Sequence, residues 1–186
     1  MKKILLIMVA GLILSMSSLA YGESNQPWTG NARLLLGGKF LDKDDWAPRG
    51  SQYQIGGLFD IRPNGWPVSI ALDVLYSRGS SNSVEAGILE ANLGVRKYFE
   101  NDPKLRIYAG GGLAFMKAIL DVTLRNAGDD DNGFGIWLDF GFDYLLTERI
   151  TIGGDLRYSA ANVSIFNAPN IRIGGLHAGL TLGYKF

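Results

Sequence analysis

The chain has 186 residues, no cysteine, one histidine and 18 residues of each charge sign. This length suits one domain, the lack of cysteine excludes a disulfide framework and a thiolate metal site, and the neutral balance argues against a nucleic-acid binder, which usually carries a basic patch. Glycine is abundant, with 25 residues, as expected where a small barrel wall curves and large inward side chains need room.

The N-terminal segment predicts an export signal. Lys2 and Lys3 precede the apolar run Ile4–Leu14, and small and polar residues follow as far as Gly22. This order is typical of a cleavable secretory signal, and the run is short for a transmembrane helix. We therefore expect three segments: a signal peptide at 1–22, a short lead at 23–28 and one exported barrel domain at 29–186.

The rest of the chain alternates between apolar and polar residues, with the period of two of a strand that has one apolar face. Eight strands are expected, at 29–41, 51–61, 68–77, 84–99, 105–120, 134–145, 150–160 and 171–186. The connections after the second, fourth and sixth strands are tight turns, the first of which contains the hairpin signal Asn64-Gly65. The other connections are predicted to be mostly longer and more polar loops, at 42–50, 125–133 and 161–170, with a short polar loop at 79–83.

The last segment, Ile171–Phe186, carries its apolar residues on one parity and ends on an aromatic residue. A soluble sandwich would rarely end in this way. The apolar faces also place aromatic residues at two heights, as at the two rims of a membrane barrel. The outer belt is predicted to hold Phe40, Tyr53, Tyr76, Phe134 and Tyr158, and the inner belt Phe99, Tyr144, Tyr184 and Phe186, with Trp66 in a turn.

These features together predict an all-β fold, an eight-stranded antiparallel up-and-down transmembrane β-barrel. The strand number is even, and each strand reaches the roughly 9–11 residues that a tilted strand needs to cross a bilayer. Short turns alternate with longer loops, which places both termini in the periplasm. A soluble β-sandwich is the alternative, but it has no reason to form two aromatic belts.

The opposite faces of the strands carry the charges, in equal numbers of each sign. Eight strands leave an interior that side chains just fill, and an unpaired charge there is costly. We expect ion pairs that fill the barrel, rather than a polar conduit or an acid–base site. Arg96, Arg106 and Asp143 are expected to cluster near the periplasmic end. The predicted network comprises Arg33, Asp73, Glu90, Arg96, Arg106, Asp139, Asp143, Asp155 and Arg157, with Lys39, Asp60 and Lys185 on the same face.

His177 is expected to face the interior with a structural role. A barrel that deacylates lipid A would need a serine nucleophile beside a histidine base, and the nearest hydroxyls, Thr181 and Ser159, give no specific signal. We therefore expect no enzyme activity, no catalytic residue and no cofactor. The acidic segment Asp129–Gly133 lacks the ligand spacing of an EF-hand and is expected to be a solvated loop rather than a calcium site.

The chain resembles the small outer-membrane β-barrels that include the OmpA transmembrane domain, OmpX and the opacity-type proteins. Four segments carry the resemblance: VRKYF (Val95 to Phe99), YAGGGLAF (Tyr108 to Phe115), Asp143 to Ser159, and the terminal pattern Leu180, Leu182, Tyr184 and Phe186. The resemblance implies that this terminal pattern is the signal read by the outer-membrane assembly machinery. No peptidoglycan-binding domain follows the barrel, so we do not expect cell-wall tethering.

The resulting functional hypothesis is a monomeric integral protein of the Gram-negative outer membrane. Its expected partners are outer-membrane lipid, lipopolysaccharide and the assembly machinery, with no nucleic acid. The expected role is structural or in surface interaction through the outer loops. The alternatives are a narrow, porin-like channel for small solutes and, third, a lipid A-modifying enzyme.

Overall fold

The computed structural model describes residues 27–41, 50–81, 84–100, 102–122, 127–165 and 168–186. The predicted signal peptide lies outside these ranges. Within them, no helix is long and apolar enough to cross a membrane. The described strands, in chain order, are β1 (Trp28–Leu41), β2 (Ser51–Pro63), β3 (Ser69–Ser81), β4 (Val84–Phe99), β5 (Leu105–Val122), β6 (Ala127–Leu145), β7 (Ile150–Ile165), β8 (Ala168–Arg172) and β9 (Gly175–Lys185).

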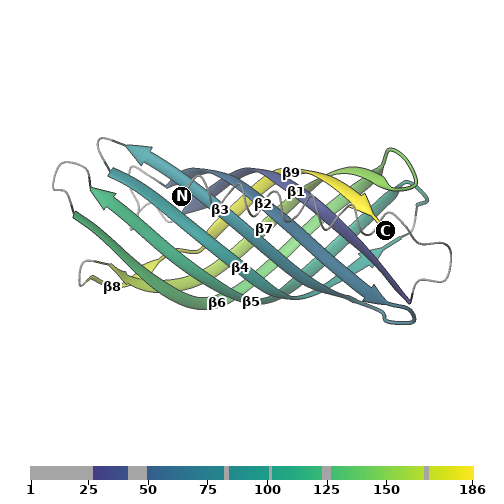
Figure 1. Cartoon of the computed structure of the whole chain (residues 1–186), viewed down its shortest axis with the longest axis horizontal. Coiled ribbons are helices and arrows are strands. Elements are labelled where there is room, and N and C mark those ends of the chain that lie inside the picture. The colour runs from purple at the N-terminus through teal and green to yellow at the C-terminus, as the bar shows by residue number, and fades with distance from the viewer. Residues whose placement is uncertain (1–26, 42–49, 82–83, 101, 123–126, 166–167) are drawn as a thin grey trace.

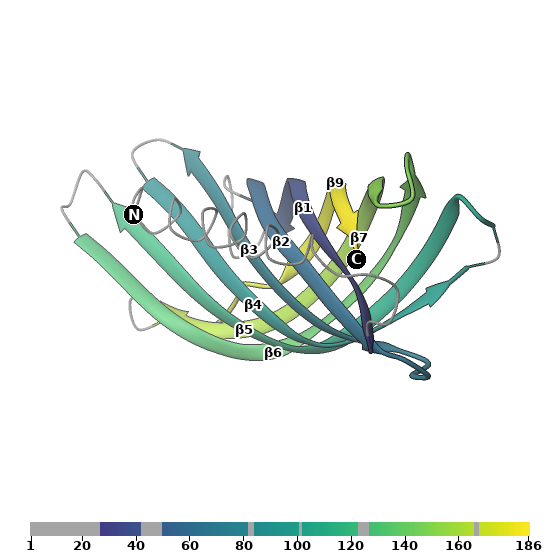
Figure 2. The same ribbon diagram turned by 45° about the vertical axis from the view of Figure 1, so that its right-hand side comes forward.

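The strands close into an antiparallel barrel (Figure 1). Strands β1 to β7 pair in sequence order, β9 pairs with β7, and β1 pairs with β9 to complete the wall. Following the paired residues once around the barrel from Gly30 leads back to Phe40, ten residues further along β1. This stagger tilts the strands against the barrel axis (Figure 2), as closure of a sheet requires.

Strands β8 and β9 together occupy one of the eight strand positions of the wall; each such position is here called a stave. The pairing of β7 with β8 at Asn162–Arg172 and with β9 at Ser159–Gly175 keeps a single register, and Ile173 N–H donates to the Ala161 carbonyl between them at 3.0 Å. The expected closing strand at 171–186 is therefore interrupted as a strand at Ile173 and Gly174, but it is continuous as a stave.

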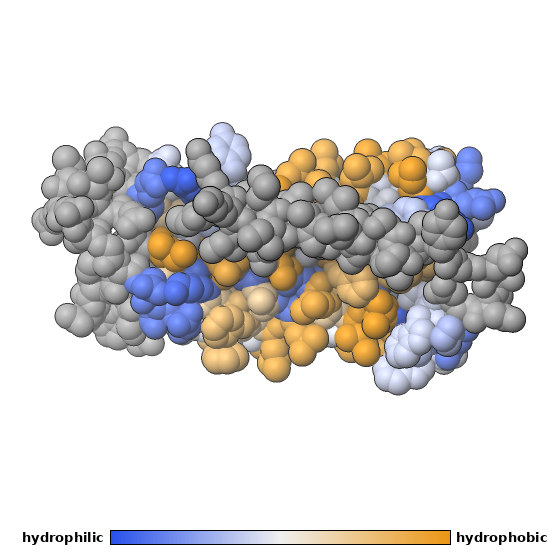
Figure 3. All heavy atoms as spheres, in the orientation of Figure 1, coloured by the Kyte–Doolittle hydropathy of each residue, from blue (hydrophilic) through white to orange (hydrophobic). Residues whose placement is uncertain are grey.

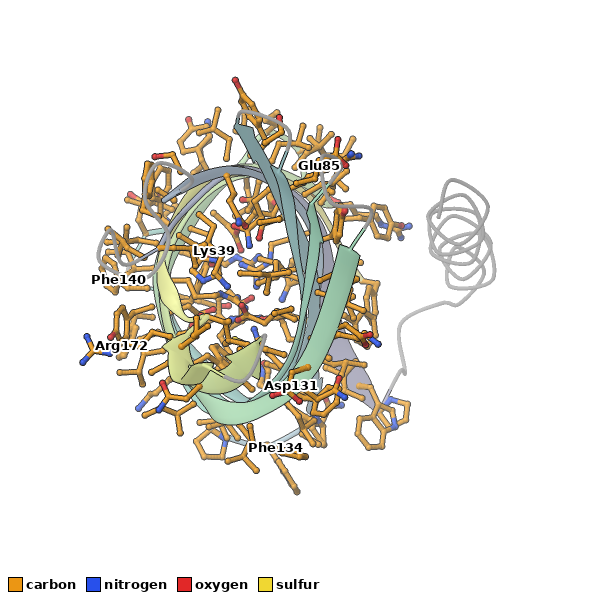
Figure 4. The ribbon with its side chains drawn as sticks, turned by 90° about the vertical axis from the view of Figure 1, so that its left-hand side faces the viewer. Lys39, Glu85, Asp131, Phe134, Phe140 and Arg172 are labelled. Atoms are coloured by element: carbon orange, nitrogen blue, oxygen red, sulfur yellow. The ribbon has the colours of Figure 1, made fainter. Side chains whose placement is uncertain are left out.

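The two faces of the wall differ as the alternation predicts. On β6, Leu138 and Phe140 are 60% and 57% exposed, whereas Trp137 and Asp139 between them are 1% and 5% exposed. Figure 3 shows an apolar band around the middle of the visible surface, with hydrophilic residues towards both ends. Viewed along the barrel, Phe134 and Phe140 point away from the ring of strands and Lys39 points into it (Figure 4).

Three of the predicted loops are partly strand, which corrects the sequence analysis. Residues 127–133 belong to β6, residues 161–165 to β7 and 168–170 to β8, and residues 79–81 to β3. These segments lack the apolar alternation because their outward side chains, such as Ser80, Asp130 and Asn162, are polar. Backbone pairing nevertheless continues, for example between Lys117 and Asn132. The wall thus extends beyond its apolar band at this end, here called the loop end.

The opposite end, here called the turn end, carries the short connections and the C-terminus. The predicted hairpin at Asn64-Gly65 lies here, and Gly65 has a φ of 83°, which an L residue adopts only with strain. Trp66 N–H donates to the Pro63 carbonyl at 3.1 Å and closes the turn. Tight turns at this end and extended strands at the other match the architecture expected from the sequence.

Candidate functional site

The inward faces of the strands meet inside the barrel and form the candidate site. The structure places all residues of the predicted network there, and none of them is more than 5% exposed. Lys39 and Asp60 are buried with them, whereas Lys185 is half-buried at the turn end. Because burying a charge costs several kcal/mol unless it is paired, the contacts between these groups decide whether the interior is stable.

Two arginines form the centre of the network. Arg96 donates from Nη2 to Asp73 at 2.8 Å, from Nε to Asp139 at 3.0 Å and from Nη1 to Asp60 at 3.2 Å. Arg157 donates from Nη2 to Asp73 at 2.6 Å and to Asp139 at 3.2 Å. The two guanidiniums therefore share two carboxylates, and charge-assisted hydrogen bonds of this kind are about twice as strong as neutral ones.

A second cluster lies towards the turn end. Arg106 Nη2 donates to Asp143 at 3.1 Å and to the Asn31 side-chain oxygen at 2.7 Å. Arg33 joins the two clusters, since its Nη2 lies 3.0 Å from Asp60 and its Nη1 lies 3.5 Å from Asp143. All seven strands from β1 to β7 contribute to this chain of contacts, so the network ties the wall together across the barrel.

The expected single cluster of Arg96, Arg106 and Asp143 is thus two clusters, bridged through Arg33. Register explains the difference. Arg96 pairs with Gly110 on β5, and Gly110 pairs with Asp139 on β6. A Cβ at Gly110 would lie 2.5 Å from an Asp139 oxygen. The missing side chain lets Arg96 reach across β5 to Asp139 instead of turning towards Asp143.

Two buried tyrosines line the network. The Tyr98 hydroxyl donates to Asp60 at 2.7 Å, and the Tyr108 hydroxyl donates to Asp155 at 2.8 Å. The Arg33 guanidinium carbon lies 4.3 Å from the centre of the Tyr108 ring, within cation–π range. Sequence reasoning did not single out Tyr98, although its inward parity beside Arg96 was the available signal.

A third group of polar residues lies towards the loop end. Lys39 Nζ is 3.1 Å from Glu90 Oε2, and Asn92 donates to the other Glu90 oxygen at 2.9 Å. Ser159 Oγ lies 3.3 Å from Glu90 and 2.9 Å from Nε2 of His177. The single histidine is therefore held among hydrogen-bond partners on the inward face.

The Ser159–His177 pair has the spacing of a nucleophile and its base, so its surroundings decide its role. Both side chains are buried, at 0% and 1% exposure. His177 Nδ1 contacts the Gln54 amide at 2.8 Å, where acyl-transfer triads place an orienting carboxylate. A lipid acyl chain would approach from the outer face of the wall, and these groups face inward. The geometry favours a structural hydrogen bond.

Apolar side chains fill the interior nearer the loop end, which the sequence analysis did not predict. The largest members are Trp137, Met116, Ile88 and Ile173, each at most 1% exposed. Leu35, Leu58 and Leu75 form a second, smaller apolar cluster. The interior is therefore not an entirely polar plug. The sequence contains this pattern, because these apolar residues interrupt the series of polar residues at the inward positions of their strands.

The predicted acidic loop Asp129–Gly133 is part of strand β6 in the structure. In this strand Asp130 and Asn132 are exposed, and Asp130 pairs with Lys117 at 2.5 Å. In the described part of the chain, no group of three or more histidine, cysteine or acidic residues is placed to hold a metal ion.

The side chains of the predicted C-terminal signal lie on the outer face of the closing stave. Leu180 and Leu182 are 70% and 57% exposed, and the Tyr184 hydroxyl accepts from Arg149 at 3.0 Å. Phe186 exchanges two backbone hydrogen bonds with Gly30, at 2.9 and 3.0 Å, and its ring stacks on Phe59 with centroids 5.9 Å apart. Phe186 thus continues the backbone pairing between β1 and β9 at the turn end.

An apolar outer band, a closed antiparallel wall and a buried ionic interior are the features of an outer-membrane barrel. The family model described as the outer membrane protein beta-barrel domain matches residues 6–186. The chain belongs to this family. Family membership supports an outer-membrane location.

Three solved structures illustrate the similarity in fold. Neisserial surface protein A has 15% identity and a TM-score of 0.65, covering 88% of this chain and 100% of its own. Ail of Yersinia pestis has 10% identity and a TM-score of 0.62, covering 87% and 100%. The N-terminal barrel of Pseudomonas aeruginosa OprF has 19% identity and a TM-score of 0.52, covering 84% and 99%. At these identities the likeness shows the fold alone, and no curated protein sequence matches.

Proposed function

We propose that this outer-membrane barrel is a closed anchor that presents its loop end at the cell surface and acts there by interaction. The observation that carries this proposal is the buried network that crosses the interior. Arg96, Arg157 and the carboxylates between them have side chains with 0% exposure. Opening a water path through this level would require these ion pairs to separate at several kcal/mol each.

The loop end supports a role at the surface. Outer-membrane barrels have short turns on the periplasmic side and longer structures outside, so the loop end faces the exterior. There the wall continues beyond the apolar band with charged outward side chains, including the ion pairs Arg78–Glu85 and Lys117–Asp130. A rim of this kind stands among lipopolysaccharide head groups, which we propose as a partner.

Conductance measurements test the closed barrel. Purified protein in planar bilayers is expected to give no current steps above the protein-free background, while a trimeric porin in the same bilayers gives its usual steps. Steps of uniform size that disappear on heat denaturation of the sample would overturn the closed anchor. Such steps would favour the second candidate, a narrow channel entered at the turn end, where a cavity of about 330 Å³ opens.

Two further proposals concern partners. We propose that Leu180, Leu182, Tyr184 and Phe186 are read by the assembly machinery, because the segment carries exposed apolar side chains and pairs with β1 to close the wall. We also propose a monomer, because the eight staves pair with each other and leave no strand edge in the apolar band for a second copy. Cross-linking in native membranes tests this, and a specific homodimer band would contradict it.

A further inference from the structure

The mouth of the barrel at the turn end is hollowed by two adjoining cavities. The larger has a volume of about 330 Å³ and the smaller about 20 Å³, and Glu100, Arg106 and Lys185 line both. Small-molecule sites have volumes from about 300 Å³ upwards, so the larger cavity lies at the lower end of their range. The closed anchor proposed above does not use this mouth.

The smaller cavity is lined by three basic residues and one acid, Glu100, and two of the basic residues, Arg106 and Lys185, also line the larger cavity. Arg106 is 5% exposed, and one of its nitrogens, Nη2, is held by Asp143 and Asn31. Its Nη1 faces Glu100 at 3.9 Å, beyond hydrogen-bond distance. The Arg106 Nε is buried and has no hydrogen-bond partner among the described residues. A deeply buried guanidinium therefore reaches the cavities with donors left over.

Two more cations flank this arginine. Lys185 lines both cavities and Arg62 lines the smaller one. Within the described ranges, neither takes part in an ion pair. Of the nearby acids, Asp102 already accepts hydrogen bonds from the backbone amides of Lys104 and Leu105, at 2.7 and 3.0 Å. Glu100, whose side chain is 45% exposed, lies 3.9 Å from Arg106 and lines both cavities.

We infer that the turn-end mouth is an anion-binding site that takes a carboxylate or phosphate group. Arg106 is the buried anchor, because its Nη1 is left to donate to an anion oxygen while Nη2 is held by Asp143 and Asn31, and its charge is poorly screened by water. Lys185 and Arg62 supply charge at the opening. A bound anion would replace the distant Glu100 side chain as the partner of Arg106 Nη1. This site goes beyond the proposed surface role and is independent of conductance.

The test uses the full-length exported protein in nanodiscs of phosphatidylcholine, which carries no net charge. The probes are acetyl-dialanine with a free carboxylate, the same peptide as its amide, and inorganic phosphate. Binding is followed by the amide resonances of Glu100 and Lys185 in NMR titrations. Saturable shifts are expected with the carboxylate and with phosphate, and none with the amide.

Matched variants separate a defined site from general charge. Lys185→Gln and Arg62→Gln are each expected to weaken binding about fivefold, the size of a partly exposed charge contact. Lys97→Gln removes the same charge from the outer face of β4, where Lys97 lies 5.5 Å from the Phe99 ring centroid, and should leave binding unchanged. Glu100→Gln should strengthen binding, whereas Glu148→Gln in a turn at the same end should not.

The outcomes are decisive in either direction. Absence of saturable binding in every arm, equal binding of the amide, or equal weakening by Lys97→Gln and Lys185→Gln would each overturn the site. A fourth arm uses nanodiscs that contain phosphatidylglycerol and no soluble anion. The same resonance shifts in that arm would support the site with a lipid head group as its ligand, and shifts with soluble probes alone would support it with a periplasmic solute. Heat-dependent gel mobility confirms that each variant is folded.

Discussion

The charge balance of the central network predicts an asymmetry between its acids and bases. The network joins four guanidiniums to five carboxylates: Arg33, Arg96, Arg106 and Arg157, and Asp60, Asp73, Asp139, Asp143 and Asp155. Asp139→Asn brings the two signs into balance, and the new amide oxygen still accepts from Arg96. Arg96→Gln does the opposite, because it leaves five carboxylates with three guanidiniums.

The structure sets the magnitudes of the two effects. Arg96 contacts three carboxylates whose side chains are fully buried, and removing one partner of a buried ion pair costs about 3–5 kcal/mol. Asp139→Asn keeps its hydrogen-bond geometry and should cost about 1 kcal/mol, the value of a typical net hydrogen bond. The double variant should be more stable than Arg96→Gln alone, because one surplus carboxylate is removed.

Reversible unfolding in urea from lipid vesicles measures these free energies, with Trp137 inside the barrel as a fluorescent reporter. The three variants and the native protein form a double-mutant cycle, whose coupling term isolates the Arg96–Asp139 interaction. If Asp139→Asn is as destabilising as Arg96→Gln, or if the two costs simply add, the charge-balance reasoning is refuted.

Three further predictions concern the wall. Leu138→Arg on the exposed apolar band should cost about 2–4 kcal/mol in vesicle unfolding, whereas Asn132→Arg beyond the band on the same strand should cost about 0–1 kcal/mol; equal costs would contradict the assigned band. Gly141→Ala places a methyl group against the Tyr108 ring and the Gly154 carbonyl and should cost about 1–3 kcal/mol by overpacking, whereas Gly141→Ala in a Tyr108→Ala background should cost less. Deleting Phe186 should lower outer-membrane levels far more than Gly30→Ala, which leaves the terminal signal intact but puts a Cβ 2.5 Å from the Phe186 ring; immunoblots of membrane fractions compare the two, and normal levels of the truncation would count against an assembly role.

The face on which each residue lies was predictable from the sequence because strand side chains alternate with a fixed period. Parity alone placed Arg33, Asp73 and Arg157 inside and Leu138 and Phe140 outside, and burial agrees in each case. The strand ends at the loop end were not predictable in this way. Beyond the apolar band water covers the outer face, so the hydrophobic contrast that marks a strand fades although backbone pairing continues.

The apolar interior near the loop end was missed for a related reason. The sequence analysis treated the whole inner face as polar, whereas the apolar side chains of Ile88 and Met116 are fully buried on that face. Charges deep in the wall can be paired across the barrel, but every additional pair carries a desolvation cost. Apolar side chains fill the same volume without that requirement, so the two kinds of filling can alternate with depth.

Which interior groups meet depends on the register between the strands, and the sequence of one strand alone does not show that register. The stagger of ten residues around the wall places residues of equal height on different pairing rows, so depth along a strand does not identify neighbours. Arg96, Asp139 and Arg157 lie on one row across β4 to β7, with Gly110 between the first two. Glycine at that position removes the only side chain that would separate Arg96 from Asp139. An inward glycine between opposite charges in a paired row is therefore evidence for a contact across it, and this evidence becomes readable once the register is known.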